Sequence, residues 1–352
     1  MVLLFDMNRK IKVLVVDDTA FMRKAVSQIL STDPDVEVAD SAKDGADAVQ
    51  KVKALRPDVI TLDIDMPVMD GLRAVRHLMI ESPVPIVVLS SLINDGFVIF
   101  EALRLGVMDF IPKPAGLISQ DAKVIRQMVD RVKLACCMKI QNVRRVRLPR
   151  TWGITERVEK LYSYRPLDYI VAIGTTLNGP NTMIRLLSKL SPTIPAAVIV
   201  VQEISQKIIS SFVKRFNDAV PWRVEEAKDG VNIEQGTCYL ASNEFSLSIQ
   251  TDSKGHPCLS YKAGISSHPL NLLFMSAAAV FRQNTVGILL SGIGDDGAEG
   301  FAAIKEKMGL TIVKDIRACV FPNLTDNAIR QGVVDMILDE PKMSETLESV
   351  MR

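Results

Sequence analysis

Histidine and cysteine are scarce in this 352-residue chain. The three histidines, His77, His256 and His268, are widely separated, so they do not predict a histidine-rich metal site. No two of the five cysteines have CxxC spacing. Since we also expect a reducing compartment, we expect no disulfide framework.

Long apolar runs and an excess of one charge are also missing. No apolar run approaches the roughly 20 residues that a membrane span requires. The first residues, "MVLLFDMNRKIKVLVV", lack the pattern of a signal peptide, so we expect a cytoplasmic protein with no membrane insertion. The net charge of +1 gives no global attraction to nucleic acid.

The composition is that of an ordinary globular protein, with 48 % apolar and 24 % charged residues, and the length suggests two domains. In the first 115 residues, strand-like runs alternate with segments that have apolar residues at helical spacing. This alternation predicts a parallel five-stranded sheet with helices on both faces. The predicted strands are residues 11–18, 36–42, 58–63, 85–91 and 108–114.

Polar side chains stand at the carboxyl ends of four of these strands, where the sites of open α/β sheets lie. They are Asp17 and Asp18, then Asp63, then Ser90, and finally Lys113. Three converging carboxylates favour a hard cation such as Mg²⁺, and a lysine and a hydroxyl suit a phosphoryl group. Each aspartate alone could instead cap a helix, as Asp18 could for the next one. Their joint order favours a site that moves phosphate onto a carboxylate.

Four motifs carry a resemblance over residues 10–128. These are "VVDD", "TLDIDMPVMDG", "VLSS" and "DFIPKP". Together they resemble a response-regulator receiver domain, which has a flavodoxin-like fold. The resemblance implies that Asp63 accepts phosphate from a histidine kinase and that Asp17, Asp18 and Asp63 hold Mg²⁺. It also implies that Ser90 and Phe110 form the switch pair and that Lys113 contacts the phosphoryl group.

Residues 129–166 are expected to form a basic linker. The stretch from Lys139 to Arg165 holds eight lysines or arginines against two glutamates, and its apolar residues show no long periodicity. A solvated tether is the simpler interpretation. The alternative is docking on an acidic partner. Because no helix-turn-helix pattern follows, we expect no binding to nucleic acid.

Strands and helices alternate again over residues 167–352, which predicts a doubly wound α/β domain. The main predicted strands are residues 169–174, 196–204 and 285–293. Four shorter runs are typical of hairpins or an antiparallel edge beside the parallel sheet. They are residues 223–228, 237–242, 245–250 and 257–263.

The three main strands end in residues that resemble an incomplete hydrolase triad. A triad requires a hydroxyl, an imidazole and a carboxylate. The strand ends carry threonines at 175 and 176, then a glutamine and a glutamate at 202 and 203, and then aspartates at 295 and 296. The hydroxyl and the carboxylate are present, but no imidazole is.

The whole chain resembles the chemotaxis protein-glutamate methylesterase family, CheB, on "GTTLNGP", "QE" and "LLSGIGDDGAEG". That family demethylates receptor glutamates and deamidates receptor glutamines, with no cofactor in its C-terminal domain. The resemblance implies that Thr176 stands at the nucleophilic serine, Glu203 at the histidine base and Asp296 at the triad aspartate. It also implies a chemotaxis histidine kinase and methyl-accepting receptors as partners.

The substitutions leave the enzymatic activity open. A glutamate is a weaker base than histidine near pH 7, and threonine adds a methyl group at a sharp turn. If Glu203 faced Asp296, the pair would share a proton, or Glu203 would turn toward a cation. One hypothesis is a pseudoenzyme that is phosphorylated on Asp63 and acts by binding. The alternative is an active methylesterase and glutaminase with an altered triad.

Overall fold

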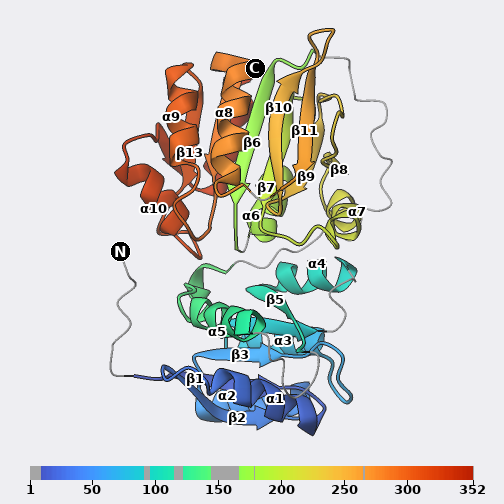
Figure 1. Ribbon diagram of the computed structural model, residues 1–352, viewed down its shortest axis with the longest axis vertical. Coiled ribbons are helices and arrows are strands. Elements are labelled where there is room, and N and C mark those ends of the chain that lie inside the picture. The colour runs from blue at the N-terminus through green and yellow to red at the C-terminus, as the bar shows by residue number, and fades with distance from the viewer. Residues whose placement is uncertain are drawn as a thin grey trace. The chain divides into compact units, whose positions relative to one another are not determined.

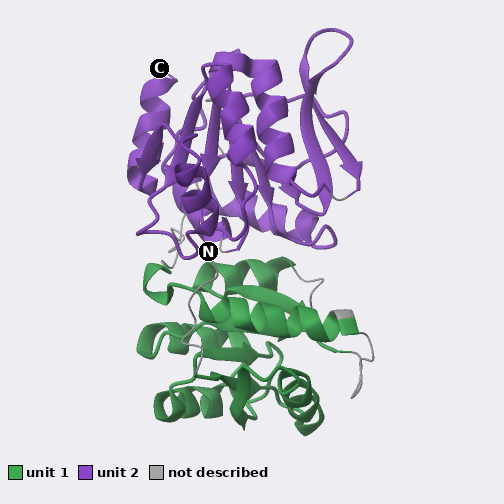
Figure 2. Ribbon diagram, turned by 60° about the vertical axis from the view of Figure 1, so that its left-hand side comes forward, with its two compact units in different colours: residues 1–145 green, residues 146–352 purple. Residues whose placement is uncertain are grey.

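The computed structural model describes residues 9–90, 96–114, 122–143, 166–177, 179–264 and 266–351. The chain divides into two compact units, residues 1–145 and 146–352, which Figure 2 distinguishes by colour. No helix in the described ranges has both the length and the apolar character needed to cross a bilayer. Each unit is described below by itself.

The first unit is built on a parallel five-stranded sheet with the order β2-β1-β3-β4-β5 (Figure 1). All five strands lie within the runs predicted from sequence, and their buried residues are mainly apolar. The α/β fold expected for this part of the chain is confirmed. The strands are β1 (Ile11–Val16), β2 (Val36–Ala42), β3 (Val59–Leu62), β4 (Ile86–Ser90) and β5 (Asp109–Pro112).

Five helices cover this sheet. Helix α1 packs against α5, while α2 packs against α3 and α3 against α4. Helix α5 continues beyond residue 128, where the linker was expected to begin, and η1 (Ile140–Asn142) follows it. Residues 144–165 of the expected linker lie outside the described residues. The helices are α1 (Ala20–Leu30), α2 (Gly45–Leu55), α3 (Gly71–Glu81), α4 (Gly96–Leu105) and α5 (Ala122–Cys136).

The second unit contains a seven-stranded sheet with the order β14-β13-β12-β6-β7-β9-β8, in which every pair is parallel. The expected parallel α/β domain is thus confirmed. Two of its strands, β13 and β14, were not predicted from sequence. The strands are β6 (Tyr169–Thr175), β7 (Ala196–Gln202), β8 (Arg223–Glu226), β9 (Thr237–Ser242), β12 (Thr285–Leu289), β13 (Leu310–Lys314) and β14 (Met336–Leu338).

Only two of the four short runs form the expected hairpin. Strands β10 (Phe245–Thr251) and β11 (Pro257–Ala263) pair antiparallel. The expectation was wrong for β8 and β9, which run parallel to each other and to β7. The connection over residues 227–236 returns the chain to the start of the sheet, so β9 runs in the same direction as β8.

Helices cover the second sheet as well (Figure 1). Helix α11 packs against α6, and α8 packs against both α9 and the β10–β11 hairpin. The rings of Phe274 and Phe301 lie 5.0 Å apart between α8 and α9. The helices are α6 (Gly179–Leu187), α7 (Ile209–Ala219), α8 (Pro269–Phe281), η2 (Arg282–Asn284), α9 (Ala298–Glu306), α10 (Asn323–Arg330) and α11 (Glu340–Val350).

Candidate functional sites

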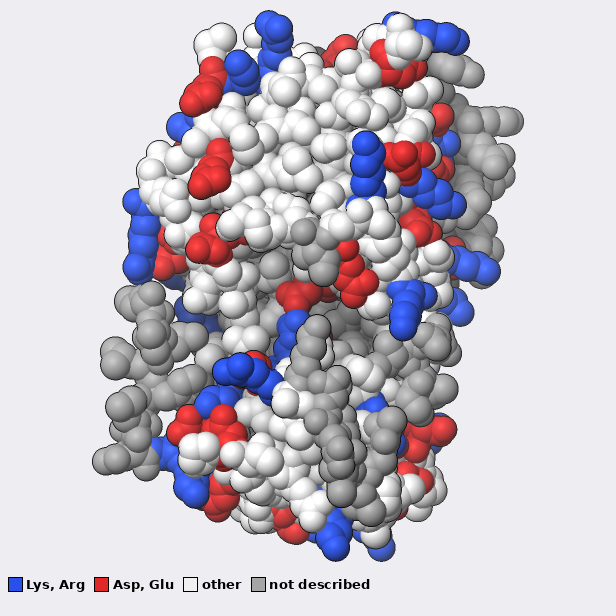
Figure 3. Space-filling view, viewed as in Figure 1, with Lys and Arg blue, Asp and Glu red and all other residues white. Residues whose placement is uncertain are grey.

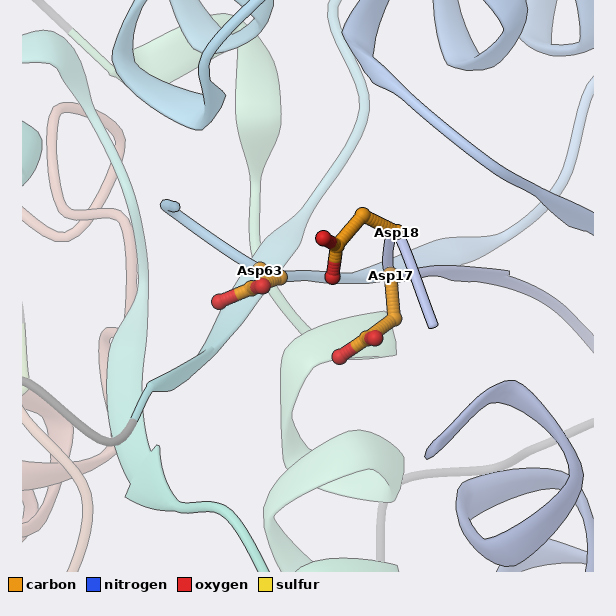
Figure 4. A group of neighbouring side chains, drawn as sticks. All are labelled: Asp17, Asp18 and Asp63. Atoms are coloured by element: carbon orange, nitrogen blue, oxygen red, sulfur yellow. The ribbon is translucent and has the colours of Figure 1, made fainter. Parts of the chain in front are cut away.

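An acidic cluster lies at the carboxyl ends of β1 and β3. Asp17 and Asp18 follow β1, and Asp63 follows β3, its neighbour in the sheet. One carboxylate oxygen from each of the three residues lies within 4.8 Å of the others (Figure 4). Asp17 and Asp63 are buried, whereas Asp18 is exposed. The topology therefore brings together the three aspartates that the sequence singled out.

Lys113, just after β5, is paired with two of these carboxylates. Its Nζ atom lies 2.8 Å from Asp17 Oδ2 and 2.7 Å from Asp63 Oδ2. Burial raises the pKa of Asp63 above its ordinary value, although the Lys113 ammonium opposes this rise. Burial works against the charge of Lys113, but its hydrogen bonds to Asp17 and Asp63 outweigh burial and raise the pKa of Lys113.

The acidic cluster suits a magnesium ion. Mg²⁺ takes oxygen ligands, keeps several waters and is commonly bound through one or two protein carboxylates. Asp17, Asp18 and Asp63 offer such oxygens, and the exposed Asp18 leaves one side open to water. The Lys113 ammonium partly neutralises the two buried carboxylates, Asp17 and Asp63, and a bound cation would neutralise the cluster further.

Two backbone features hold the aspartates in place. Asp63 Oδ1 accepts a hydrogen bond from the Ile64 N–H at 2.8 Å. Gly71, at the start of α3, lies so close that an added Cβ atom would stand 2.3 Å from the Asp63 carbonyl oxygen. Only glycine fits there, which explains the "MDG" sequence beyond β3.

Thr19 is a site-supporting residue that sequence reasoning missed. Its N–H and hydroxyl donate to Asp17 Oδ1 at 2.9 and 2.8 Å, and its own oxygen accepts from the Met22 N–H to cap α1. The alternative in which Asp18 caps this helix is therefore wrong. A threonine after a strand, three residues before a helical N–H, was the available signal.

The predicted switch pair lies on neighbouring strands. Ser90 is the buried last residue of β4, and Phe110 is half-buried in β5. The backbone N–H of Lys113 donates to the Ser90 carbonyl at 3.3 Å, which ties the lysine to the end of β4. Their roles in switching stay predictions.

The three triad-equivalent positions follow three adjacent strands of the second sheet. Asp296 comes after β12, Thr176 after β6 and Glu203 after β7, and these strands are neighbours in that order. From β6 the chain continues to β7 on one side, and from β12 it continues to β13 on the other. The carboxyl ends of β12 and β6 therefore form the topological switch point of the sheet. Ligands of open α/β sheets bind at such points.

The Thr176 hydroxyl is bonded to the backbone of Ile293. Its oxygen accepts from the Ile293 N–H at 2.8 Å, and its proton is donated to the Ile293 carbonyl at 3.4 Å. An added Cβ atom at Gly292 would stand 2.5 Å from Thr176 Oγ1, so the glycine makes this close approach possible. The neighbouring Thr175 is buried and donates to the Ser291 carbonyl at 2.8 Å. Both threonines thus have bonds to the loop after β12.

Asp296 is bonded to the first turn of α8. Its Oδ2 accepts from the Leu270 N–H at 2.7 Å and its Oδ1 from the Asn271 N–H at 3.0 Å. Burial raises the pKa of Asp296, and these two hydrogen bonds act in the opposite direction. The raised pKa of Asp296 thus arises from burial, and the two arrangements expected for Glu203, a shared proton or a turn toward a cation, stay predictions. Glu203 itself is half-buried beyond β7.

One face of the described surface carries both charges without a large patch of either (Figure 3). On the face seen in Figure 3, basic and acidic side chains are interspersed in both units. This agrees with the near-zero net charge of the sequence.

Comparisons with known proteins cover both units. Residues 13–124 match the response regulator receiver domain, and residues 171–347 match the CheB methylesterase family. A protein-glutamate methylesterase/protein-glutamine glutaminase of Pyrococcus horikoshii is 35 % identical over 97 % of this chain and 94 % of its own length. One of the same name from Caldanaerobacter subterraneus subsp. tengcongensis is 36 % identical over 97 % of this chain and 96 % of its own length. The chain therefore belongs to the CheB protein-glutamate methylesterase family of response regulators.

Proposed function

We propose that this protein is a chemotaxis response regulator that is phosphorylated on Asp63 and whose effector domain, residues 167–352, acts mainly by binding, with impaired hydrolysis. The contacts of Thr176 carry this proposal. At the nucleophile position, the Thr176 hydroxyl accepts from the Ile293 N–H at 2.8 Å and lies 3.4 Å from the Ile293 carbonyl, and the residue at the base position is Glu203, a carboxylate. A hydroxyl nucleophile is activated by an adjacent base, and the imidazole that does this in a triad is replaced here by a carboxylate.

The expected loss is large. In one well-studied hydrolase, removing the triad serine or histidine costs about a millionfold, and roughly 10³–10⁴ over water remains. Because residues of one triad act as a unit, two substitutions do not cost twice as much. We therefore expect at most the residual level, from the binding site and its backbone donors.

The second candidate is an active methylesterase and glutaminase with an altered triad. The relatives favour it, because proteins 31 to 36 % identical over most of this chain carry that name. Threonine is a nucleophile in enzymes that supply a base. In this candidate, Glu203 would have to accept the proton from Thr176.

We propose that a chemotaxis histidine kinase phosphorylates the receiver with Mg²⁺ bound by the acidic cluster, and that methyl-accepting receptors in the cytoplasm are the effector partners. The family membership supports both partners. The three carboxylates and Lys113 support the phosphorylation step, because a cation and an ammonium can balance the charge added to Asp63.

Methanol release from methylated receptor separates the two candidates. We expect the phosphorylated protein to bind receptor and to release methanol no faster than a Thr176→Ala variant. Release that is at least a hundredfold faster for the natural chain would establish the active enzyme and refute impairment. A variant with Asp63→Asn should lose labelling by phosphodonor, while Asp65→Asn, at an exposed position two residues away, should keep it.

A further inference from the structure

Helices α8 and α9 of the effector domain both begin without a side-chain cap of their own. His268 precedes α8 and makes no capping hydrogen bond through its side chain, and Gly297, which precedes α9, has no side chain that could cap. The first N–H groups of a helix have no partner within the helix. At these two helices, the partners come from the opposite segment.

Asp296 caps α8 from the loop that precedes α9. Its two oxygens accept from Leu270 at 2.7 Å and Asn271 at 3.0 Å, both in the first turn. A carboxylate is favoured at this position, because the amino end of a helix carries partial positive charge.

Asn271, in the first turn of α8, caps α9 in the same way. Its Oδ1 accepts from the Gly297 N–H at 3.0 Å and from the Gly300 N–H at 2.9 Å. The side chain is buried, and its amide donates to Glu299 at 3.4 Å. Asp296, just before α9, thus caps α8, and Asn271, in the first turn of α8, caps α9. We call these two residues the capping clamp.

The capping clamp ends the loop that contacts Thr176. This loop, residues 290–297, begins where the Leu290 N–H donates to the Gly174 carbonyl at 3.0 Å. In its middle, the Ile293 N–H donates to Thr176 Oγ1 at 2.8 Å. Its far end is held by Asp296. The loop is therefore fixed between the end of β6 and the amino end of α8.

We infer that Asp296 is a positioning residue: with Asn271 it joins the amino ends of α8 and α9, and so places the Ile293 N–H against Thr176. This role requires no base. It goes beyond the proposed function, because it holds whether the domain hydrolyses esters or only binds receptor. It gives Asp296 a role in a chain without the triad histidine.

Amide hydrogen exchange of the full chain tests the inference, with Asp296→Ala and Asn271→Ala as the main variants. Losing a helix cap costs about 1 kcal/mol, which corresponds to exchange that is roughly five- to tenfold faster. The amides of β7 should exchange as before. The amides expected to accelerate are those of Leu270, Asn271, Ile293, Gly297 and Gly300.

Two further variants and a double variant complete the design. Asp296→Asn keeps an oxygen acceptor, so its effect should be smaller than that of alanine. Asp295→Ala changes the exposed neighbouring aspartate and should leave these amides unchanged. The double variant Asp296→Ala/Asn271→Ala should accelerate Ile293 by less than the product of the two single effects.

Three results would overturn the inference. The first is unchanged exchange at Ile293 in both alanine variants. The second is an equal acceleration throughout β7, which would indicate general destabilisation. The third is independent, multiplicative effects of the two substitutions. If Asp296→Ala does not fold, Asp296→Asn replaces it, alone and in a double variant with Asn271→Ala.

Discussion

Glu340 should govern the acid stability of the effector domain. It begins α11 and is buried with two cations. Arg185 of α6 donates to both of its oxygens at 2.7 Å, and the Lys314 Nζ atom lies 2.7 Å from Oε1. Burial opposes the charge of Glu340, but hydrogen bonds and charge from Arg185 and Lys314 outweigh it and lower its pKa from 4.5 to about 2.

The sign and size of the effect follow from the lowered pKa. A carboxyl whose pKa is lower in the folded state adds stability that is fully present above pH 4.5 and is lost as the pH falls toward 2. The shift of about 2.5 pKa units corresponds to about 3 kcal/mol. Over this range, the free energy of unfolding of the effector domain should therefore fall by about that amount through Glu340 alone.

Glu340→Gln should remove this pH dependence and destabilise the domain at neutral pH. It removes the carboxylate that pairs with Arg185 and with Lys314, whose side chain is 3 % exposed. Breaking a buried ion pair by removing one partner costs about 3–5 kcal/mol. At pH 2, where the natural glutamate is half protonated, the difference between the two proteins should shrink.

Urea unfolding between pH 2 and 7 measures the prediction. The buried Trp222 reports on the effector domain, and a Trp152→Phe background makes its fluorescence the only tryptophan signal. Glu345→Gln, an exposed position on the same helix, is the matched control and should keep the natural acid limb. If the free energy of unfolding of Glu340→Gln falls as steeply between pH 4.5 and 2 as that of the natural protein, the reasoning is refuted.

Three other predictions concern the receiver and the triad positions. Val68 has a φ of 66°, a left-handed conformation that asparagine adopts more easily than a β-branched residue, and it is 83 % exposed. Val68→Asn should therefore raise the free energy of unfolding of the receiver by about 1 kcal/mol. A loss of stability in urea unfolding would contradict this. Lys113→Gln leaves two buried carboxylates without their ammonium, so Mg²⁺ should raise the Tm of this variant more than that of the natural protein. An equal Mg²⁺ effect would show that the lysine does not occupy the cation position. The combination of Thr176→Ser with Glu203→His should increase methanol release at least tenfold, in a pH profile with an apparent pKa near that of histidine; an increase without this pH dependence would count against Glu203 as the base position.

For the receiver, the sequence by itself determined both the fold and the acidic site. Strand-length apolar runs alternated with helical spacing, and parallel strands end at one edge of their sheet. Asp17 and Asp63 therefore had to approach each other once β1 and β3 became neighbours. The same logic brought Thr176, Glu203 and Asp296 to three adjacent strand ends, and the missing imidazole was visible without any structure.

Tertiary structure alone decided features that depend on pairing across long distances in the chain. The direction of β8 and β9 was one of these, because a short alternating strand has the same pattern in parallel and antiparallel pairs. The bonds of Asp296 to α8, 26 and 25 residues away, were another. So was the pairing of Arg185 with Glu340 across 155 residues. Sequence periodicity reports which face of an element is buried, whereas the partner of a buried polar group is selected only when the elements pack.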